Sequence, residues 1–402
     1  MGIQTDHEDL VPFENNFPIG DEFTGGNFRP HLSYQYADFE CDVDETSDDG
    51  RLNAVHGTHT MGIVAATPDN GLGTTGVCWH CPLVLGSFYG DHTDGQAATA
   101  TVAQALTEAA DKGAQIASMS FGIADSCPPS SGNFGSEFLC DALDQFAPRE
   151  ILFLAASGND LVEVELPAIH EDVVAVGAIE TDGTHWTRLD QDCDDNDECG
   201  SNFSQNPANQ TLDLVAPGQF VLSTVYTGEG YEYPLGYDDG GCGDEFPDDS
   251  IPGNDADGYG ACTGTSMSSP YIAGALALLR TANPLLTRDQ LRQILQDHAS
   301  LADSWDPKLG YGLPDVAASM EATLGRVDGE LVTNRATPMF RLHSAVYDTH
   351  LFTSSPQAAI AEIEGVGGGD FDPDLAAPLV TGFPALPGDT QPAPRAPFWL
   401  FT

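Results

Sequence analysis

The sequence contains few basic residues. Among 402 residues there are 13 lysines and arginines against 62 aspartates and glutamates, which gives a formal net charge of −49. Nucleic acid would be repelled by such a charge, so we exclude it as a partner. The acidity fits adaptation to high salt, binding of many cations, or simple solubility outside the cell, and all three explanations stay open.

Long apolar runs are absent as well. No stretch of about 18 apolar residues occurs, so no segment is predicted to span a membrane. A chain of 402 residues is long enough to bury a large core. Its length favours one large α/β domain with a small appendage over several domains of equal size.

Three short motifs stand out against this background. In chain order they are His-Gly-Thr-His at 56–59, Ala-Ala-Ser-Gly-Asn at 155–159, and Gly-Thr-Ser-Met-Ser-Ser-Pro at 264–270. The last motif precedes an apolar run, which predicts that Ser266 lies at the start of a buried helix. Unpaired N–H groups and the helix dipole suit a nucleophile there, although an N-cap serine is the simpler alternative.

The other two motifs are ambiguous when each is taken alone. His56 is predicted to lie at the start of a helix, where a histidine is more often structural than catalytic. Asn159 follows a buried strand over 151–156. An asparagine there is usually a turn former, but its side-chain amide can also donate to an oxyanion.

Taken together and in this order, the motifs resemble those of the subtilisin-like serine proteases (subtilases, peptidase family S8) over residues 1–323. The resemblance implies an α/β fold with a doubly wound, mostly parallel sheet. It makes Ser266 the nucleophile, His56 the general base and then acid, and Asn159 the oxyanion donor. His59 would be a structural neighbour and not a second base.

The first ten residues resemble the end of the subtilase motif that carries the catalytic aspartate. Gly2, Ile3 and residues 7–10 fit this motif without a gap, which places the expected aspartate one position before Met1. We therefore expect a truncated reading frame, with a signal peptide and a pro-segment outside the chain. The alternative is that Asp6 or Asp9 completes the triad.

The resemblance also implies structural calcium. Subtilases often bind the ion in a loop that corresponds here to residues 67–77, which are rich in oxygen ligands. We expect Asp9 and Asp69 to be its ligands. The acidic stretch 42–49 is a second candidate for a cation, or a loop that only faces water.

In subtilases, two segments lie on either side of an extended substrate and bind its backbone by β-strand addition. For Gly122, which lies in one of these segments, the alternative to substrate binding is an ordinary role as a turn glycine. The residues implied to bind substrate are Ser120, Phe121 and Gly122 in one segment and Asp94 and Gly95 in the other.

Three acids follow the oxyanion motif, at the place where the family builds the wall of its P1 pocket, the site for the substrate residue whose carbonyl is attacked. They are Asp160, Glu163 and Glu165. Their charge predicts a preference for lysine or arginine at P1.

Nine cysteines indicate an oxidising compartment, which predicts a secreted protein. Cys78 and Cys81 are expected to form a tight disulfide, with half of a metal site as the alternative. Cys41 is left over. The other expected pairs are Cys127 with Cys140, Cys193 with Cys199, and Cys242 with Cys262.

Strands alternate with helices along the chain, which predicts a parallel sheet covered on both faces. We divide the chain into a catalytic domain, 1–325, and a β-rich tail, 326–402. The tail is either one and a fraction repeats that start at Met339 and Phe398, or a plain β-hairpin. The expected strands are 82–88, 114–120, 151–156, 172–179 and 212–215, and helices are expected over 94–112, 287–298 and 313–324.

The function that follows is secreted endopeptidase activity on polypeptides through an acyl-enzyme on Ser266, carried out by a monomer. A catalytically impaired subtilase that only binds peptides or a surface polymer is the alternative. An α/β-hydrolase esterase is disfavoured, because that fold places Gly-x-Ser-x-Gly around the nucleophile and its histidine after it, whereas His56 precedes Ser266.

Overall fold

The structure of the chain is a computed structural model. The statements below concern only the residues that it describes, and side chains are discussed for a subset of them. These residues are 9–10, 34–35, 48–68, 72–79, 81, 83–87, 95–111, 114–129, 134–146, 150–188, 199–225, 258–324, 326–327, 330–331, 338–344, 349–353, 372–380 and 398–401.

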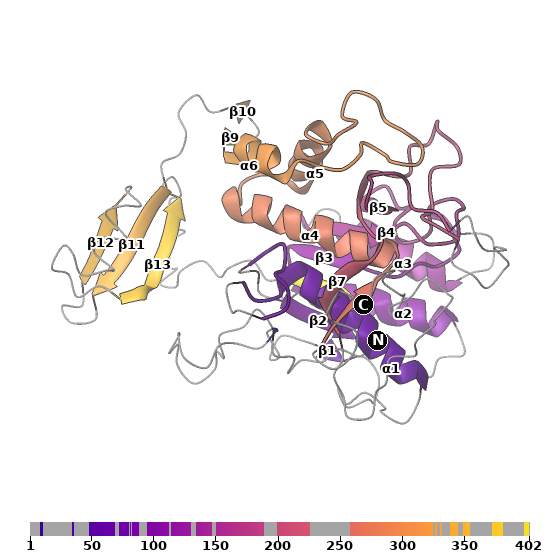
Figure 1. Cartoon of the computed structure of the whole chain (residues 1–402), viewed down its shortest axis with the longest axis horizontal. Coiled ribbons are helices and arrows are strands. Elements are labelled where there is room, and N and C mark those ends of the chain that lie inside the picture. The colour runs from indigo at the N-terminus through magenta and orange to yellow at the C-terminus, as the bar shows by residue number, and fades with distance from the viewer. Residues whose placement is uncertain are drawn as a thin grey trace. The chain divides into compact units, whose positions relative to one another are not determined.

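A seven-stranded sheet of the order β1-β2-β14-β3-β4-β5-β6 forms the centre of the fold (Figure 1). Every pair of neighbouring strands is parallel. The fold class expected from the sequence is therefore confirmed. The strands are β1 (Tyr34–Gln35), β2 (Leu83–Ser87), β3 (Ile116–Met119), β4 (Leu152–Ala156), β5 (Val173–Ile179), β6 (Leu214–Pro217) and β14 (Phe398–Phe401).

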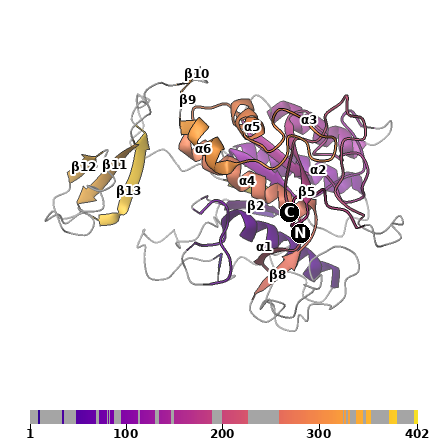
Figure 2. The same cartoon turned by 45° about the horizontal axis from the view of Figure 1, so that its top comes forward.

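Helices cover both faces of this sheet (Figures 1 and 2). One apolar cluster joins the sheet to α1, α4 and α5, and a second joins it to α2 and α3. The helices are α1 (Asp48–Ala65), α2 (Gly95–Asp111), α3 (Phe134–Phe146), α4 (Thr265–Ala282), α5 (Arg288–Asp297) and α6 (Val316–Leu324).

Strand β4 shows why the sheet is apolar on both faces. Leu152 and Leu154 lie in the cluster with α1 and α4, while Phe153 and Ala155 lie in the cluster with α2 and α3. All of β4 is buried. Because successive side chains of a strand point to opposite faces, a strand between two helical layers needs a continuous apolar run.

The central position between β2 and β3 is occupied by β14. Phe398 pairs with Leu83 on one side and with Ile116 on the other. The sequence analysis placed residues 398–402 in the tail, whereas the structure pairs 398–401 with the catalytic body. The reason lies in the four apolar residues of β14, Phe-Trp-Leu-Phe, which suit a strand with neighbours on both edges.

The chain divides into two compact units, 1–323 with 395–402, and 324–394. The second unit contains an antiparallel sheet in which β11 (Pro338–Ser344) pairs with β12 (Thr349–Thr353), as expected for Met339 and its partner strand. A third strand, β13 (Asp372–Val380), was not predicted. The short pair β9 (Arg326–Val327) and β10 (Glu330–Leu331) precedes them.

The structure corrects the sequence-based position of His56. Helix α1 begins at Asp48, about two turns before the histidine, and not at His56. The acidic residues Asp48 and Asp49 are favourable in the first turn of a helix, and no proline interrupts the segment. His56 therefore lies inside the helix.

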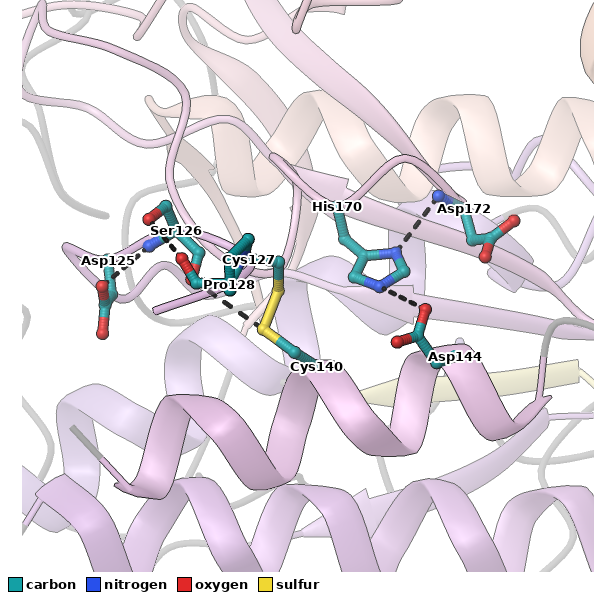
Figure 3. Close-up of a disulfide and its surroundings, with 8 residues drawn as sticks. All are labelled: Asp125, Ser126, Cys127, Pro128, Cys140, Asp144, His170 and Asp172. Carbon is teal, nitrogen blue, oxygen red and sulfur yellow. Dashed lines mark hydrogen bonds and ion pairs between the residues drawn. A yellow bond between two sulfur atoms is a disulfide. The ribbon is translucent and has the colours of Figure 1, made fainter. Parts of the chain in front are cut away.

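Two predicted disulfides are present, Cys78–Cys81 and Cys127–Cys140. The second one links the segment after β3 to α3, an element that was not predicted (Figure 3). Cys262 is also in a disulfide. It lies in β8 (Tyr259–Cys262), which pairs with β7 (Val221–Thr224) in a hairpin that was not predicted. The expected partners Cys242 and Cys193, like Cys41, lie outside the described residues, and Cys199 is buried.

In the part of the chain described here, we find no helix with the length and apolar character needed to cross a membrane.

Candidate active site

Ser266 lies in the first turn of α4 and is partly exposed, although residues 258–265 and 267–270 are buried. The hydroxyl groups of the other two serines of the motif make polar contacts in the protein interior. Ser268 Oγ donates to Ala216 O at 3.0 Å, and Ser269 Oγ lies 3.4 Å from a hydroxyl of β3. Of the three serine hydroxyls, Ser266 is thus the one open to solvent. Gly264 caps the helix with a φ of 148°, in the region that glycine adopts readily.

The backbone of Ser266 is tied to the end of β3. Pro270 lies inside α4 and has no N–H, so it cannot donate to the carbonyl four residues earlier, that of Ser266. Ser120 Oγ donates to this carbonyl at 2.9 Å. In return, Ser266 Oγ donates to Ser120 O at 3.4 Å. The residue after β3 therefore holds both the backbone and the side chain of Ser266.

Asn159 follows β4, the neighbour of β3, and its side chain is oriented by Thr265. Its Oδ1 accepts hydrogen bonds from Thr265 N at 2.9 Å and Thr265 Oγ1 at 2.8 Å. Thr265 Oγ1 accepts from Gly158 N at 3.2 Å, so the hydroxyl proton is directed to Asn159. This assigns the acceptor end of the amide to Thr265. The donor end, Nδ2, then faces away from Thr265 and lies near Gly264, two residues before Ser266.

His56 lies on α1, which packs against α4. Burial lowers the pKa of its imidazole to about 4, so the ring is neutral at pH 7 and can accept a proton. Its Nδ1 is buried and has no hydrogen-bond partner among the described residues. No hydrogen bond between described residues joins its ring to Ser266, so that contact stays a prediction.

His59, one turn after His56, has a different environment. Its Nε2 donates to Val221 O at 2.8 Å and lies 3.2 Å from Gly260 O. The side chain is fully buried, and burial lowers its pKa to about 3. A ring that holds the β7–β8 hairpin through its N–H is a structural neighbour, in agreement with the role expected from the sequence.

A protein-family model described as "Subtilase family" matches residues 2–312 of this chain. The chain belongs to the subtilase family. It is 31% identical over 269 residues to alkaline elastase YaB from Bacillus sp. (strain YaB), a match that covers 66% of this chain and 54% of that protein. It is 30% identical over 318 residues to the halolysin-like extracellular serine protease Nep from Natrialba magadii, covering 78% of this chain and 45% of Nep.

The chain spans about half the length of each of these two relatives. Among solved structures, fervidolysin from Fervidobacterium pennivorans, a keratinolytic enzyme related to subtilisin, superposes with a TM-score of 0.50. The match is 22% identical and covers 74% of this chain and 42% of fervidolysin, which shows a shared fold. Membership of the subtilase family supports serine endopeptidase activity, and nothing in these comparisons favours an impaired binding module.

The first of the two substrate segments expected in a subtilase, Ser120 to Gly122, directly follows β3. Ser120 is buried, Phe121 is half-buried and Gly122 is exposed. The next residue, Ile123, forms an antiparallel bridge with Leu166. The side chain of Glu165 lies next to Gly122. Of the other segment, Asp94 lies outside the described residues, and Gly95 begins α2.

Of the two expected calcium ligands, Asp9 is fully buried, and Asp69 lies outside the described residues. The Asp9 carboxylate accepts a hydrogen bond from Thr74 N at 3.2 Å, and its carbonyl accepts from Thr67 N at 2.9 Å. Asp9 is therefore attached to both ends of the loop in which calcium was expected. A buried carboxylate beside this loop fits a cation ligand.

A different group of ligand atoms, in Asp144, His170 and Asp172, lies within 4.8 Å of one another (Figure 3). His170 Nδ1 accepts from Asp172 N at 3.1 Å, and Nε2 lies 3.3 Å from Asp144 Oδ1. The Asp172 carboxylate is paired with Arg288. Because each member already has a partner in the protein, this group is better explained as a polar network than as a metal site.

Proposed function

We propose that this chain is a secreted serine endopeptidase that hydrolyses peptide bonds through an acyl-enzyme on Ser266. The observation that carries the proposal is the set of hydrogen bonds by which Thr265 orients Asn159. They aim the amide donor next to the one serine of the motif that is open to solvent. This is the arrangement that acyl transfer requires, a nucleophile beside a fixed oxyanion donor.

In the proposed reaction, His56 takes the proton of Ser266 Oγ as this oxygen bonds to the carbonyl carbon of the scissile peptide. The carbonyl oxygen becomes an oxyanion, which Asn159 Nδ2 and Ser266 N stabilise as donors. The C–N bond then breaks, and protonated His56 gives its proton to the leaving amine. Water attacks the ester with His56 again as base, which releases the acid and regenerates the serine.

His56 in this mechanism needs an acceptor for Nδ1. Asp9, one of the two alternatives for the triad aspartate, is not supported in this role, because its carboxylate is bound to Thr74 N. Asp6 lies outside the described residues. We propose that the carboxylate comes from outside the described residues.

We further propose that the protein acts on polypeptides as a monomer outside the cell, with calcium bound by Asp9 and Asp69. Nep is described as extracellular, and the disulfides in the chain suit an oxidising compartment. The carboxylate of Asp9 beside the 67–77 loop supports the calcium site.

The test is covalent labelling with a fluorophosphonate probe, followed by peptide mass spectrometry and a casein-cleavage assay. We expect the label on Ser266, and we expect Ser266→Ala to lose both the label and the cleavage. Ser268→Ala is the matched control, because its hydroxyl is buried and donates to a backbone carbonyl. If the probe labels another residue, or Ser266→Ala retains full activity, the proposed function is wrong.

A further inference from the structure

Glu165 places a carboxyl group between the two segments nearest to Ser266. One segment follows β3 and contains Gly122, and the other follows β4 and contains Gly158. A methyl group added at Gly122 would collide with Glu165 Oε2, and one added at Gly158 would lie 3.1 Å from Glu165 Cδ. Glycine at both positions therefore leaves room for this carboxyl group, which is partly exposed to solvent.

A second acid lies beside Glu165. Burial and a hydrogen bond with the neighbouring Asp160 raise the pKa of Glu165 to about 7. Near neutral pH the Glu165 carboxyl group is therefore protonated for part of the time. A cation placed between them would release this proton and remove the repulsion between the two charges.

The third acid of this region points elsewhere. Glu163 accepts hydrogen bonds from Thr211 Oγ1 at 2.6 Å and from Gln205 N at 3.1 Å. These hydrogen bonds attach the Glu163 carboxylate to residues 205 and 211. The sequence-based hypothesis treated all three acids alike, whereas the structure separates Glu163 from Asp160 and Glu165.

Asn202 places a buried amide donor beside the same space. The side chain is fully buried, and its Oδ1 accepts from Asp160 N at 2.9 Å and Val162 N at 3.0 Å. Its Nδ2 is aimed at Gly158, because a methyl group there would collide with it. This donor has no partner of strict hydrogen-bond geometry among the described residues, but it interacts with the Glu165 carboxyl group and lowers the pKa of that group, against the larger raising effect of burial.

We propose that Glu165, with Asp160 beside it, determines specificity by binding the side chain of a lysine or arginine at P1. The proposal rests on the proposed function, because P1 is defined by the attack of Ser266. The carbonyl that Ser266 attacks must place its oxygen at Asn159. The P1 Cα is bonded to that carbonyl, so its side chain starts beside Gly158 and Asn159, and a long side chain reaches Glu165.

The charge of a basic side chain matches this environment. Its charged end meets a carboxylate, and such charge-assisted hydrogen bonds are stronger than neutral ones. An apolar P1 side chain would instead remove water from Glu165 without replacing its hydrogen bonds, which is costly.

The experiment compares kcat/KM for two fluorogenic peptides that differ only in arginine or leucine at P1, in the full chain and in Glu165→Gln. We expect the full chain to prefer arginine. Glu165→Gln should lower the ratio of arginine to leucine cleavage by about 10- to 100-fold, the size of a lost hydrogen bond to a charged group. Glu163→Gln is the matched control and should leave the ratio unchanged.

A second measurement does not depend on catalysis. Titration with p-aminobenzamidine, a fluorescent cation of the arginine type, should show binding to the full chain and to Ser266→Ala, and at least about 10-fold weaker binding to Glu165→Gln. Preference for leucine in the full chain, or equal cation binding by Glu165→Gln, would overturn the proposal. Cation binding without fluorophosphonate labelling or cleavage would overturn the proposed function and leave the cation site in place.

Discussion

At the scale of single residues, Asn159 shows how a short polar side chain acquires a defined orientation. Both donors of Thr265, its N–H and its hydroxyl, converge on Oδ1. The rotation that would exchange the amide oxygen and nitrogen would place donors against donors. The orientation of Nδ2 is therefore set before any substrate arrives, which is what stabilisation of an oxyanion requires.

Replacing Asn159 by leucine removes this donor while keeping the approximate size of the side chain. We expect kcat to fall by about 100- to 1000-fold with little change in KM, the loss known for the corresponding donor of subtilisin. Steady-state kinetics on one peptide substrate would measure it. Asn209→Leu, a change at an exposed loop position, serves as the control. A fall in kcat below about 10-fold would contradict the assigned role.

At the scale of secondary-structure elements, α4 depends on a partner from β3. Pro270 leaves Ser266 O without its usual donor, and the Ser120 hydroxyl takes the place of the missing N–H. Residues 146 positions apart in the chain are joined in this way. The contact fixes the start of the helix, and with it the nucleophile, relative to the sheet.

We expect Ser120→Ala to lower the free energy of unfolding by about 1–3 kcal/mol, because it leaves a buried carbonyl without a donor. Pro270→Ala would restore an N–H four residues after Ser266. The cost of Ser120→Ala should therefore be smaller in the Pro270→Ala background. Urea unfolding of the four proteins in this double-mutant cycle measures the difference. Equal costs in both backgrounds would show that Pro270 is not the reason for the contact.

The disulfide between Cys127 and Cys140 acts at the same scale, because it fixes the end of the substrate segment to α3. It closes a loop with a sequence separation of 13. Replacing both cysteines by alanine should cost about 3 kcal/mol on the chain-entropy account. It should also raise KM, since the segment that binds the substrate loses its attachment.

The disulfide between Cys78 and Cys81, with a separation of 3, is the matched control. Its removal should cost only about 1.6 kcal/mol on the same account and should leave KM unchanged. Thermal unfolding together with peptide kinetics distinguishes the two pairs. An equal rise in KM for both pairs would show that the Cys127–Cys140 disulfide has no specific effect on the substrate segment.

At the scale of the whole molecule, the buried histidines make stability depend on pH. Burial holds the pKa values of His56 and His59 at about 4 and about 3, against 6.5 in the unfolded chain. Below pH 6.5 the unfolded chain takes up protons that the folded chain does not. The free energy of unfolding should therefore fall as the pH drops from 6.5 toward 4, by up to about 1.4 kcal/mol per pH unit for each histidine.

Glu165 acts in the opposite direction, since its pKa is raised from 4.5 to about 7. Its contribution to stability is fully present below pH 4.5 and is lost as the pH rises through 7. Urea unfolding between pH 4.5 and 7 tests both effects. His59→Gln should reduce the loss at acid pH, and Glu165→Gln should reduce the loss near neutrality. A free energy that does not change with pH would contradict this account.

Calcium is the second influence on the stability of the whole molecule. If Asp9 and Asp69 hold the ion, chelation with EGTA should lower Tm by about 4 °C, the effect on a unit of this size of an ion present at about 100 times its Kd. Calcium should restore the Tm, and Asp9→Asn should no longer respond to EGTA. A Tm of the unchanged protein that is insensitive to EGTA would contradict the site.

The linear sequence was sufficient to predict the local features. The apolar run of β4 and the helix α5 were found because their signals lie within a few neighbouring residues. The capping box of Thr287 and Gln290 at the start of α5 is a signal of this kind. Helix α3 and the β7–β8 hairpin were not predicted. Each adjoins a segment rich in turn-forming residues, which made the whole region resemble a loop.

The short motifs around His56, Asn159 and Ser266 identified the family for the same reason, since each motif is contiguous in the chain. Contacts between distant residues could not be predicted in this way. Ser120 meets Ser266 O, Glu165 lies beside Gly122, and β14 enters the sheet between β2 and β3 only because the fold brings separate segments together. Side-chain periodicity records which face of an element is buried, but it does not record which distant partner covers that face.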